Sequence, residues 1–231
     1  MKQDFVNDVM SRISPEVYLY EAIKTTLPKL IGGDVYSIIA AYSEPWRKYH
    51  NCNHILQMLN FTYPGYLGEE LGLNSKNRKA LRTMIIFHDI VYKLGREKGW
   101  NESESANFAR SCLTRYSNQE DQEFLDLVCA GILATATHDL CTVKRKHQKL
   151  VCWLIDIDLF VGFGANWEEF ESNTLLIAEE YSPLYTREEY YSGRAKFAKV
   201  FLERENIFHT EHFAQYEQVV RENLTRIAKG S

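Results

Sequence analysis

Apolar residues recur at helical spacing along almost the whole chain, and this periodicity restricts the fold more than any other feature. Nowhere does the strict apolar–polar alternation of a half-buried strand persist. The short apolar runs 85–87 and 154–157 lie inside longer segments with apolar residues every three or four positions, so we assign both to buried helices. The pattern predicts an all-α fold.

Residues that start and end helices divide the chain into roughly nine to ten helical segments. Three capping residues are followed three positions later by Glu, which satisfies free N–H groups of the first turn: Ser117 with Glu120, Asn166 with Glu169, and Thr186 with Glu189. The stretch 64–68 is typical of a loop. We predict helices at residues 15–30, 34–42, 45–61, 75–93, 101–116, 118–138, 145–161, 167–181, 187–204 and 211–228.

The composition is that of a compact globular protein. The chain has 231 residues, 45% of them hydrophobic and 25% charged, so we expect a single domain over 1–231. Its motifs lie at about 40–165, with the C-terminal helices packed on them. The net charge of −4 argues against a nucleic-acid partner, and a homo-oligomer is compatible with the sequence. Without an apolar leader or a run of membrane length, we expect a cytoplasmic protein that does not bind membranes.

Two histidines four residues apart, His50 and His54, form the first candidate site. On a helix over 45–61 they would project from one face and could act on one ligand. The zinc-protease pattern shares this spacing but has Glu after the first His, where this chain has Asn51, so that chemistry is not expected. Taken alone, the pair is equally compatible with structural or exposed histidines.

The adjacent pair His88 and Asp89 follows the apolar run 84–86. An ionised carboxylate at the end of a buried helix is costly unless a partner neutralises it, and a metal ion would do so. The structural alternative is an Asp that caps the next turn beside a core His bonded to a carbonyl.

Asp158 shares a very apolar run with Asp156. On a helix, Leu154 and Ile155 lie on the same face as Asp158, whereas Asp156 is turned away from it. A carboxylate on the face that points to the core needs an opposite charge, so we expect Asp158 rather than Asp156 as a further metal ligand.

The resulting order of His54, then His88-Asp89, then Asp158 resembles the HD superfamily of metal-dependent phosphohydrolases. The resemblance implies a helical HD-type bundle in which these four residues bind a divalent metal. Two imidazoles and two carboxylates suit Mn²⁺, Fe²⁺, Co²⁺, Ni²⁺ or Zn²⁺ better than Mg²⁺, which prefers oxygen ligands. His138, at the end of an apolar helix, is a candidate for a second ion or a phosphate contact, against the alternative of an imidazolium at a helix C-terminus.

The segment 49–54 is also similar to a helix of the distantly related cyclic-nucleotide phosphodiesterases. That similarity implies that His50 donates a proton while His54 is a ligand. Some HD nucleotidases carry a catalytic Glu three residues after the Asp, where this chain has Tyr92. We therefore expect Glu102 to orient or deprotonate the attacking water.

Residues 40 to 228 are similar to a bacterial group of HD phosphohydrolases that share three short motifs. Here these are Asn101-Glu102-x-x-Ser105-Ala106, Thr135-x-x-His138 and Tyr190-x-x-Gly193-Arg194. Arg194 and Arg47, which lies one turn before His50, are candidates to bind phosphate through their planar forks of donors. The alternative for each is a surface salt bridge.

We expect a metal-dependent hydrolase of a phosphate ester or anhydride with one or two bound ions. A small phosphorylated substrate, foremost a nucleotide, is the expected partner. An HD-type di-iron oxygenase and a non-catalytic module that binds a nucleotide or a metal are the two alternatives.

Overall fold

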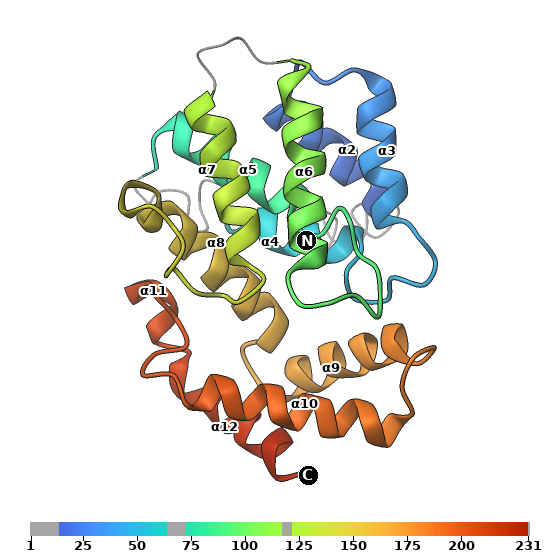
Figure 1. Ribbon diagram of the computed structural model, residues 1–231, viewed down its shortest axis with the longest axis vertical. Helices are drawn as coiled ribbons and strands as arrows, with labels where there is room; N and C mark the ends of the chain where they lie inside the picture. Colours follow the sequence, from blue (N-terminus) through green and yellow to red (C-terminus); the bar gives the residue numbers. More distant parts are fainter. Residues whose placement is uncertain (1–13, 64–72, 117–121, 231) are drawn as a thin grey trace, which may run out of the picture.

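All regular structure in the described part of the chain is helical. The computed structural model describes residues 14–63, 73–116 and 122–230, and these contain no strand. They form eleven helices, ten of which have seven or more residues (Figure 1). The helices are α2 (Pro15–Thr26), α3 (Gly32–Tyr42), α4 (Cys52–Asn60), α5 (Ser75–Phe87), α6 (Trp100–Thr114), α7 (Gln122–Ala134), α8 (Arg145–Phe163), α9 (Trp167–Tyr181), α10 (Arg187–Leu202), α11 (Glu211–Ala214) and α12 (Glu217–Lys229). The prediction of an all-α fold is confirmed.

Two of the three predicted capping pairs are present. The side chain of Asn166 accepts a hydrogen bond from the backbone N–H of Glu169, and Thr186 forms a reciprocal capping box with Glu189. The third pair, Ser117 with Glu120, and the loop expected at 64–68 lie outside the described residues.

The prediction of one helix over 45–61 is wrong, because the chain runs through turns until Asn51. Asn51 has an extended backbone, and its side chain accepts a hydrogen bond from the N–H of Asn53, so it acts as the N-cap of α4. His54 lies in the first turn of α4, whereas His50 precedes the helix. The two histidines therefore do not share a helical face.

Helix α5 ends at Phe87, six residues before the predicted end at 93. His88 and Asp89 lie in the turn that follows, where their side chains are not bound to the periodicity of a helix. The segment predicted as a single helix over 211–228 is divided into α11 and α12 by a turn at 215–216.

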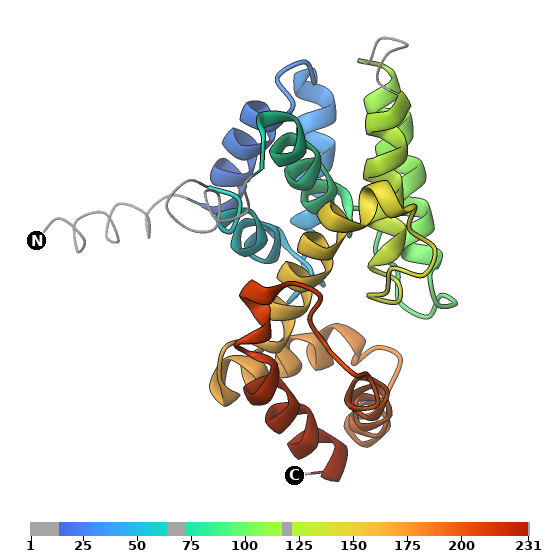
Figure 2. The ribbon, with the colours of Figure 1, turned by 90° about the vertical axis from the view of Figure 1, so that its left-hand side faces the viewer.

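Helix α8 has 19 residues and is the central element of the molecule. It packs against α4, α5 and α7 on one side and against α9 on the other, with Val151, Leu154 and Ile155 inaccessible to solvent. In Figure 2 it runs between a group formed by α2–α7 and a group formed by α9–α12. Side chains from both groups can thus meet beside α8.

Asp156 of α8 is fully buried and ties the C-terminal helices to it. Its carboxylate accepts hydrogen bonds from the backbone N–H groups of His209 and Thr210, just before α11, and from the Thr210 hydroxyl. Its role is therefore structural.

None of the described helices is by itself long and apolar enough to cross a membrane. Helices α8 and α9 reach the required length and composition only as a pair, and they meet at an angle of 92°.

Candidate metal centre

Four residues from three parts of the chain converge beside α8. His54 comes from α4, His88 and Asp89 from the turn after α5, and Asp158 from α8. One ligand atom each of His54, His88 and Asp89 lies within 4.8 Å of the other two, and both imidazoles are almost completely buried. The protein thus contains a buried His/His/Asp group that could hold a metal ion.

The distances within the group are close to those between ligands of one transition-metal ion. Nε2 of His88 lies 3.1 Å from Oδ2 of Asp89 and 3.3 Å from Nε2 of His54, which lies 3.8 Å from the same Oδ2. Oδ1 of Asp158 lies 3.4 Å from Nε2 of His54 and 3.8 Å from Nε2 of His88. Ligands at about 2.1 Å from an ion are about 3.0 Å apart in an octahedron and about 3.4 Å apart in a tetrahedron.

His88 is held in the tautomer that a metal ligand requires. Its Nδ1 donates a hydrogen bond to the carbonyl oxygen of Ile85 at 2.9 Å, so the neutral ring has its lone pair on Nε2. Two imidazole Nε2 atoms only 3.3 Å apart need a proton or a metal ion between them. Burial would lower the pKa of His88, but the charge and hydrogen bond of Asp89 raise it to about 9. A proton and a metal ion therefore compete for this position.

The remaining ligands have the protonation states that metal binding needs. Burial would raise the pKa of Asp89 and of Asp158, but the neighbouring histidines hold both pKa values well below their usual range. Burial lowers the pKa of His54, which keeps its ring neutral. At neutral pH the centre therefore offers two carboxylates and the neutral imidazole of His54, while a metal ion must displace a proton from His88.

His50 lies beside these residues, paired with Glu180 from the end of α9. Its Nδ1 is 2.6 Å from Oε2 of Glu180, while Oε1 accepts hydrogen bonds from the backbone N–H groups of Tyr49 and His50. The His50 ring stacks on Tyr92 with 4.1 Å between ring centres. Burial alone would lower the pKa of His50, but Glu180 and the charge of Asp89 hold it above its usual value.

Glu180 is a functional candidate that the sequence did not reveal. It is 1% exposed, while its neighbour Glu179 is exposed and pairs with Lys48. Nothing in the local sequence separates the two glutamates. Only the packing of α9 against the turns before α4 brings Glu180 to His50.

The Asn-Glu-x-x-Ser-Ala motif lies at the start of α6, facing the turn that carries His88 and Asp89. The Asn101 side chain bonds to the backbone N–H and carbonyl of Lys93, and the Ser105 hydroxyl bonds to both backbone groups of Val91. These contacts fix the chain that follows Asp89. Burial raises the pKa of Glu102, on which the charges of Asp89 and His138 also act.

His138 reaches the centre from the turn after α7. Its Nε2 lies 3.0 Å from Oδ2 of Asp158, the oxygen that is not shared with His54. His138 has a φ of +49°, a left-handed conformation that is uncommon for a residue with a side chain. Arg204 donates hydrogen bonds to the carbonyl oxygens of Thr137 and His138 and so holds this strained turn.

The two predicted phosphate-binding arginines have different surroundings. Arg47 is buried, pairs with Glu44 and donates hydrogen bonds to the carbonyl oxygens of His50, Asp89 and Ile90. These contacts occupy its donors and favour a structural role over phosphate binding. Arg194 of α10 forms no hydrogen bond or ion pair with any residue that the structure describes.

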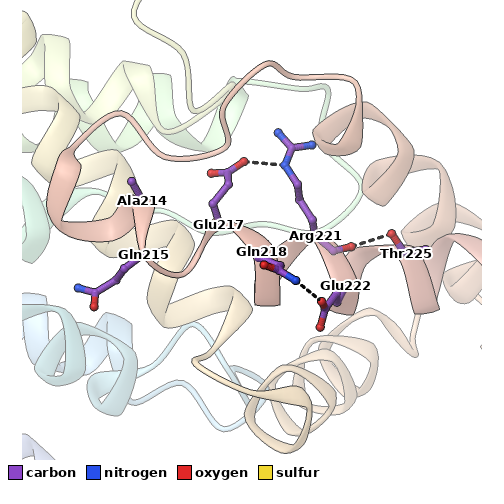
Figure 3. A pocket seen from close by; sticks show the side chains of 7 residues that line it. All are labelled: Ala214, Gln215, Glu217, Gln218, Arg221, Glu222 and Thr225. Carbon is purple, nitrogen blue, oxygen red and sulfur yellow. Dashed lines mark hydrogen bonds and ion pairs between the residues drawn. The ribbon is translucent and has the colours of Figure 1, made fainter.

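A pocket of about 600 Å³ lies away from the predicted ligands, against α11 and α12. Its charged side chains are paired within the lining, as Figure 3 shows for Glu217 with Arg221 and for Gln218 with Glu222. Glu217 also accepts hydrogen bonds from the backbone N–H groups of Ile207 and Phe208. These groups stabilise the C-terminal helices and offer no chemistry like that of the metal centre.

Comparisons of the chain with protein-family models, with curated proteins and with solved structures gave no significant match. The candidate centre therefore rests on its own residues and their geometry.

Proposed function

We propose that the protein is a metal-dependent phosphohydrolase of the HD type, which cleaves a phosphate ester or anhydride of a small molecule. The convergence of His54, His88, Asp89 and Asp158 carries this proposal, since each imidazole Nε2 lies 3.1–3.8 Å from the other Nε2 and from both carboxylates. Their order in the chain is the one that the resemblance to HD enzymes implies.

The donor set is suited to a divalent transition metal. His54, His88, Asp89 and Asp158 would hold such an ion, which would polarise a phosphoryl oxygen and lower the pKa of water. The two ligand carboxylates balance its charge.

In this proposal His50 protonates the leaving oxygen. Its Nδ1 is held by Glu180, which leaves Nε2 as the nitrogen that can reach a substrate. When water attacks phosphorus and the P–O bond breaks, the leaving oxygen takes the Nε2 proton. Because Glu180 raises the pKa of His50, the acid keeps its proton near neutral pH.

Glu102 supplies the complementary base. It is partly buried at the start of α6 and lies within electrostatic reach of Asp89, His88 and His138. Its raised pKa suits a carboxylate that orients the attacking water and takes up its proton. His50 and Glu102 thus form an acid and base pair.

The test is a metal analysis of the purified protein combined with phosphate release from nucleotides and simple phosphomonoesters under several divalent ions. Wild-type protein should bind about one or two ions per chain and release phosphate, whereas His54→Ala should lose both properties. His209→Ala, which changes an exposed histidine, is the matched control. Full metal content and activity in His54→Ala would disprove the proposal.

A two-iron oxygenase is the second candidate, favoured by the position of His138. Asp158 faces His54 through Oδ1 and His138 through Oδ2, so it could bridge two ions. Glu102 lies within electrostatic reach of His138 and could complete the second position. Two irons per chain and substrate-dependent O₂ consumption without phosphate release would favour this candidate.

A further inference from the structure

Arg194 is a half-buried cation that packs against aromatic side chains. Its Cζ lies 4.7 Å from the ring centre of Phe197 and 5.8 Å from that of Phe170. Its Nε is shielded from solvent and has no hydrogen-bond partner among the described residues, and none of them forms an ion pair with it. Burial accordingly lowers the pKa of Arg194. A buried Nε donor without an acceptor is costly, and no described carboxylate balances the charge, so this position is suited to an anion.

Three other arginines, two of them buried and one half-buried, show how the fold usually satisfies such a group. Arg47 binds three carbonyl oxygens and Glu44, and Arg204 binds two carbonyl oxygens. Arg82 donates to the hydroxyls of Thr26, Thr62 and Tyr63. Arg194 differs from all three in lacking an oxygen partner within the described chain.

Tyrosines lead from Arg194 towards the metal centre. Tyr190 lies one turn before Arg194 on α10, and its ring centre is 6.1 Å from that of Tyr181, while Tyr49 lies within electrostatic reach of Arg194. Tyr92 donates its hydroxyl hydrogen to Tyr181, whereas Tyr49 is buried and its hydroxyl has no partner. Tyr49 and Tyr181 therefore each keep a hydrogen that an anion could accept.

This group of donors adjoins the metal centre without being part of it. The ring centre of Tyr49 lies 4.8 Å from that of His54 and 4.9 Å from that of His50, and Tyr92 stacks on His50. Tyr181, which accepts the hydroxyl hydrogen of Tyr92, lies beside Tyr190, one turn before Arg194. These tyrosines connect Arg194 to the metal centre, but Arg194 itself forms no ion pair with the described carboxylates of that centre.

We propose that Arg194, with the hydroxyls of Tyr49 and Tyr181, binds a second acidic group of the substrate while the phosphoryl group to be cleaved lies at the predicted ligands. This inference rests on the proposed function and narrows its substrate class. The substrate is a small phosphate ester that carries a second phosphate or a carboxylate. Arg194 is well suited to either group, because its planar fork can donate two parallel hydrogen bonds.

The kinetic test compares three short-chain substrates: n-propyl phosphate, 1,3-propanediol bisphosphate and 3-phosphooxypropanoate. The wild-type protein should prefer one of the last two over n-propyl phosphate by about ten- to a hundredfold in kcat/KM, and which one identifies the second group. Arg194→Gln should reduce this ratio to near one, chiefly through KM, and Arg194→Lys should restore part of it. Arg187→Gln, an exposed arginine on the same helix, should keep the wild-type ratio. An unchanged ratio in Arg194→Gln would overturn the inference.

A binding test separates this inference from the proposed function. Asp89→Ala, which should lack both metal and turnover, is titrated with inorganic phosphate while its Tm is followed. Phosphate should raise Tm in this background, and adding Arg194→Gln should abolish the increase. Arg194-dependent binding without hydrolysis of any phosphate ester would leave the anion site standing and remove the proposed function. Hydrolysis of phosphate esters without Arg194-dependent binding or preference would support the proposed function and overturn the anion site.

Discussion

The predicted ligands all come from α4, α8 and the turn after α5, whereas α9 and α10 supply Glu180 and Arg194 from the opposite side. On the ligand side, short-range features of the chain identify each residue: a histidine in a first turn, a His-Asp pair after an apolar helix, a carboxylate on an apolar face. On the other side, each residue gains its role from the packing of α9 and α10. The residues of the proposed site therefore come from both groups of helices in Figure 2.

The largest loss of metal affinity and activity should follow from removing a predicted ligand while α9 and α10 stay unchanged. Asp89→Ala should lower metal affinity and phosphate release by roughly a thousandfold or more, because it takes away a charged ligand from a buried site. A divalent ion at a hundred times its Kd should stabilise the wild-type protein by about 2.7 kcal/mol, and Asp89→Ala should lose this gain. Thermal unfolding of both proteins with and without Mn²⁺ measures this stabilisation.

Glu180→Gln should separate catalysis from metal binding. It should retain metal but lower kcat by about ten- to a hundredfold, since the proton donor loses its orienting carboxylate. Because Glu180 raises the pKa of His50, the variant should lose activity at a lower pH than the wild type does on the alkaline side. The pH profile of kcat measures the shift, and Glu179→Gln, one residue earlier, is the control. If Glu180→Gln lost metal as strongly as it lost activity, Glu180 would instead hold the metal ligands in position.

The fold could be predicted from periodicity because almost every element is an amphipathic or buried helix. The predicted helix boundaries are wrong where hydrogen bonds from side chains begin or end a helix. Asn51 caps α4 with its own side chain, which moved His50 off the predicted helix. Helix α5 stops before His88, where Arg47 binds the carbonyl oxygens of Asp89 and Ile90. Long-range contacts of this kind leave no periodic signal in the chain.

The candidate site shows the same division. The structure brings together the residues that the sequence marked as ligands, and it adds His138 through Asp158. Glu180 could not be identified from the sequence, because it lies next to the exposed Glu179 on α9 and the local sequence does not distinguish the two. The sequence makes both arginines candidates for phosphate binding, Arg194 through its Tyr-x-x-Gly-Arg motif, and only their tertiary partners show how their surroundings differ.

Substitution of Arg47 and of Arg194 tests whether the two arginines contribute differently to stability. Arg47→Gln should lower the free energy of unfolding by about 2–4 kcal/mol, because buried carbonyl oxygens at the end of α5 lose their donors. Arg194→Gln should change it by less than about 1 kcal/mol, since no oxygen partner is lost. Urea denaturation of both variants measures the difference. Similar losses in both would mean that Arg194 also serves the fold.

The smallest expected effect concerns His138, where the two sides meet through Arg204. Its φ of +49° suits Asn far better than a β-branched residue, so His138→Val should be less stable than His138→Asn by about 1–2 kcal/mol. Both variants remove the imidazole, so their difference reports the backbone alone. If Arg204 imposes this conformation, the difference should shrink in an Arg204→Gln background, where the turn can relax. Urea denaturation of the four variants tests this, and an undiminished difference would show that the ligand side holds the turn by itself.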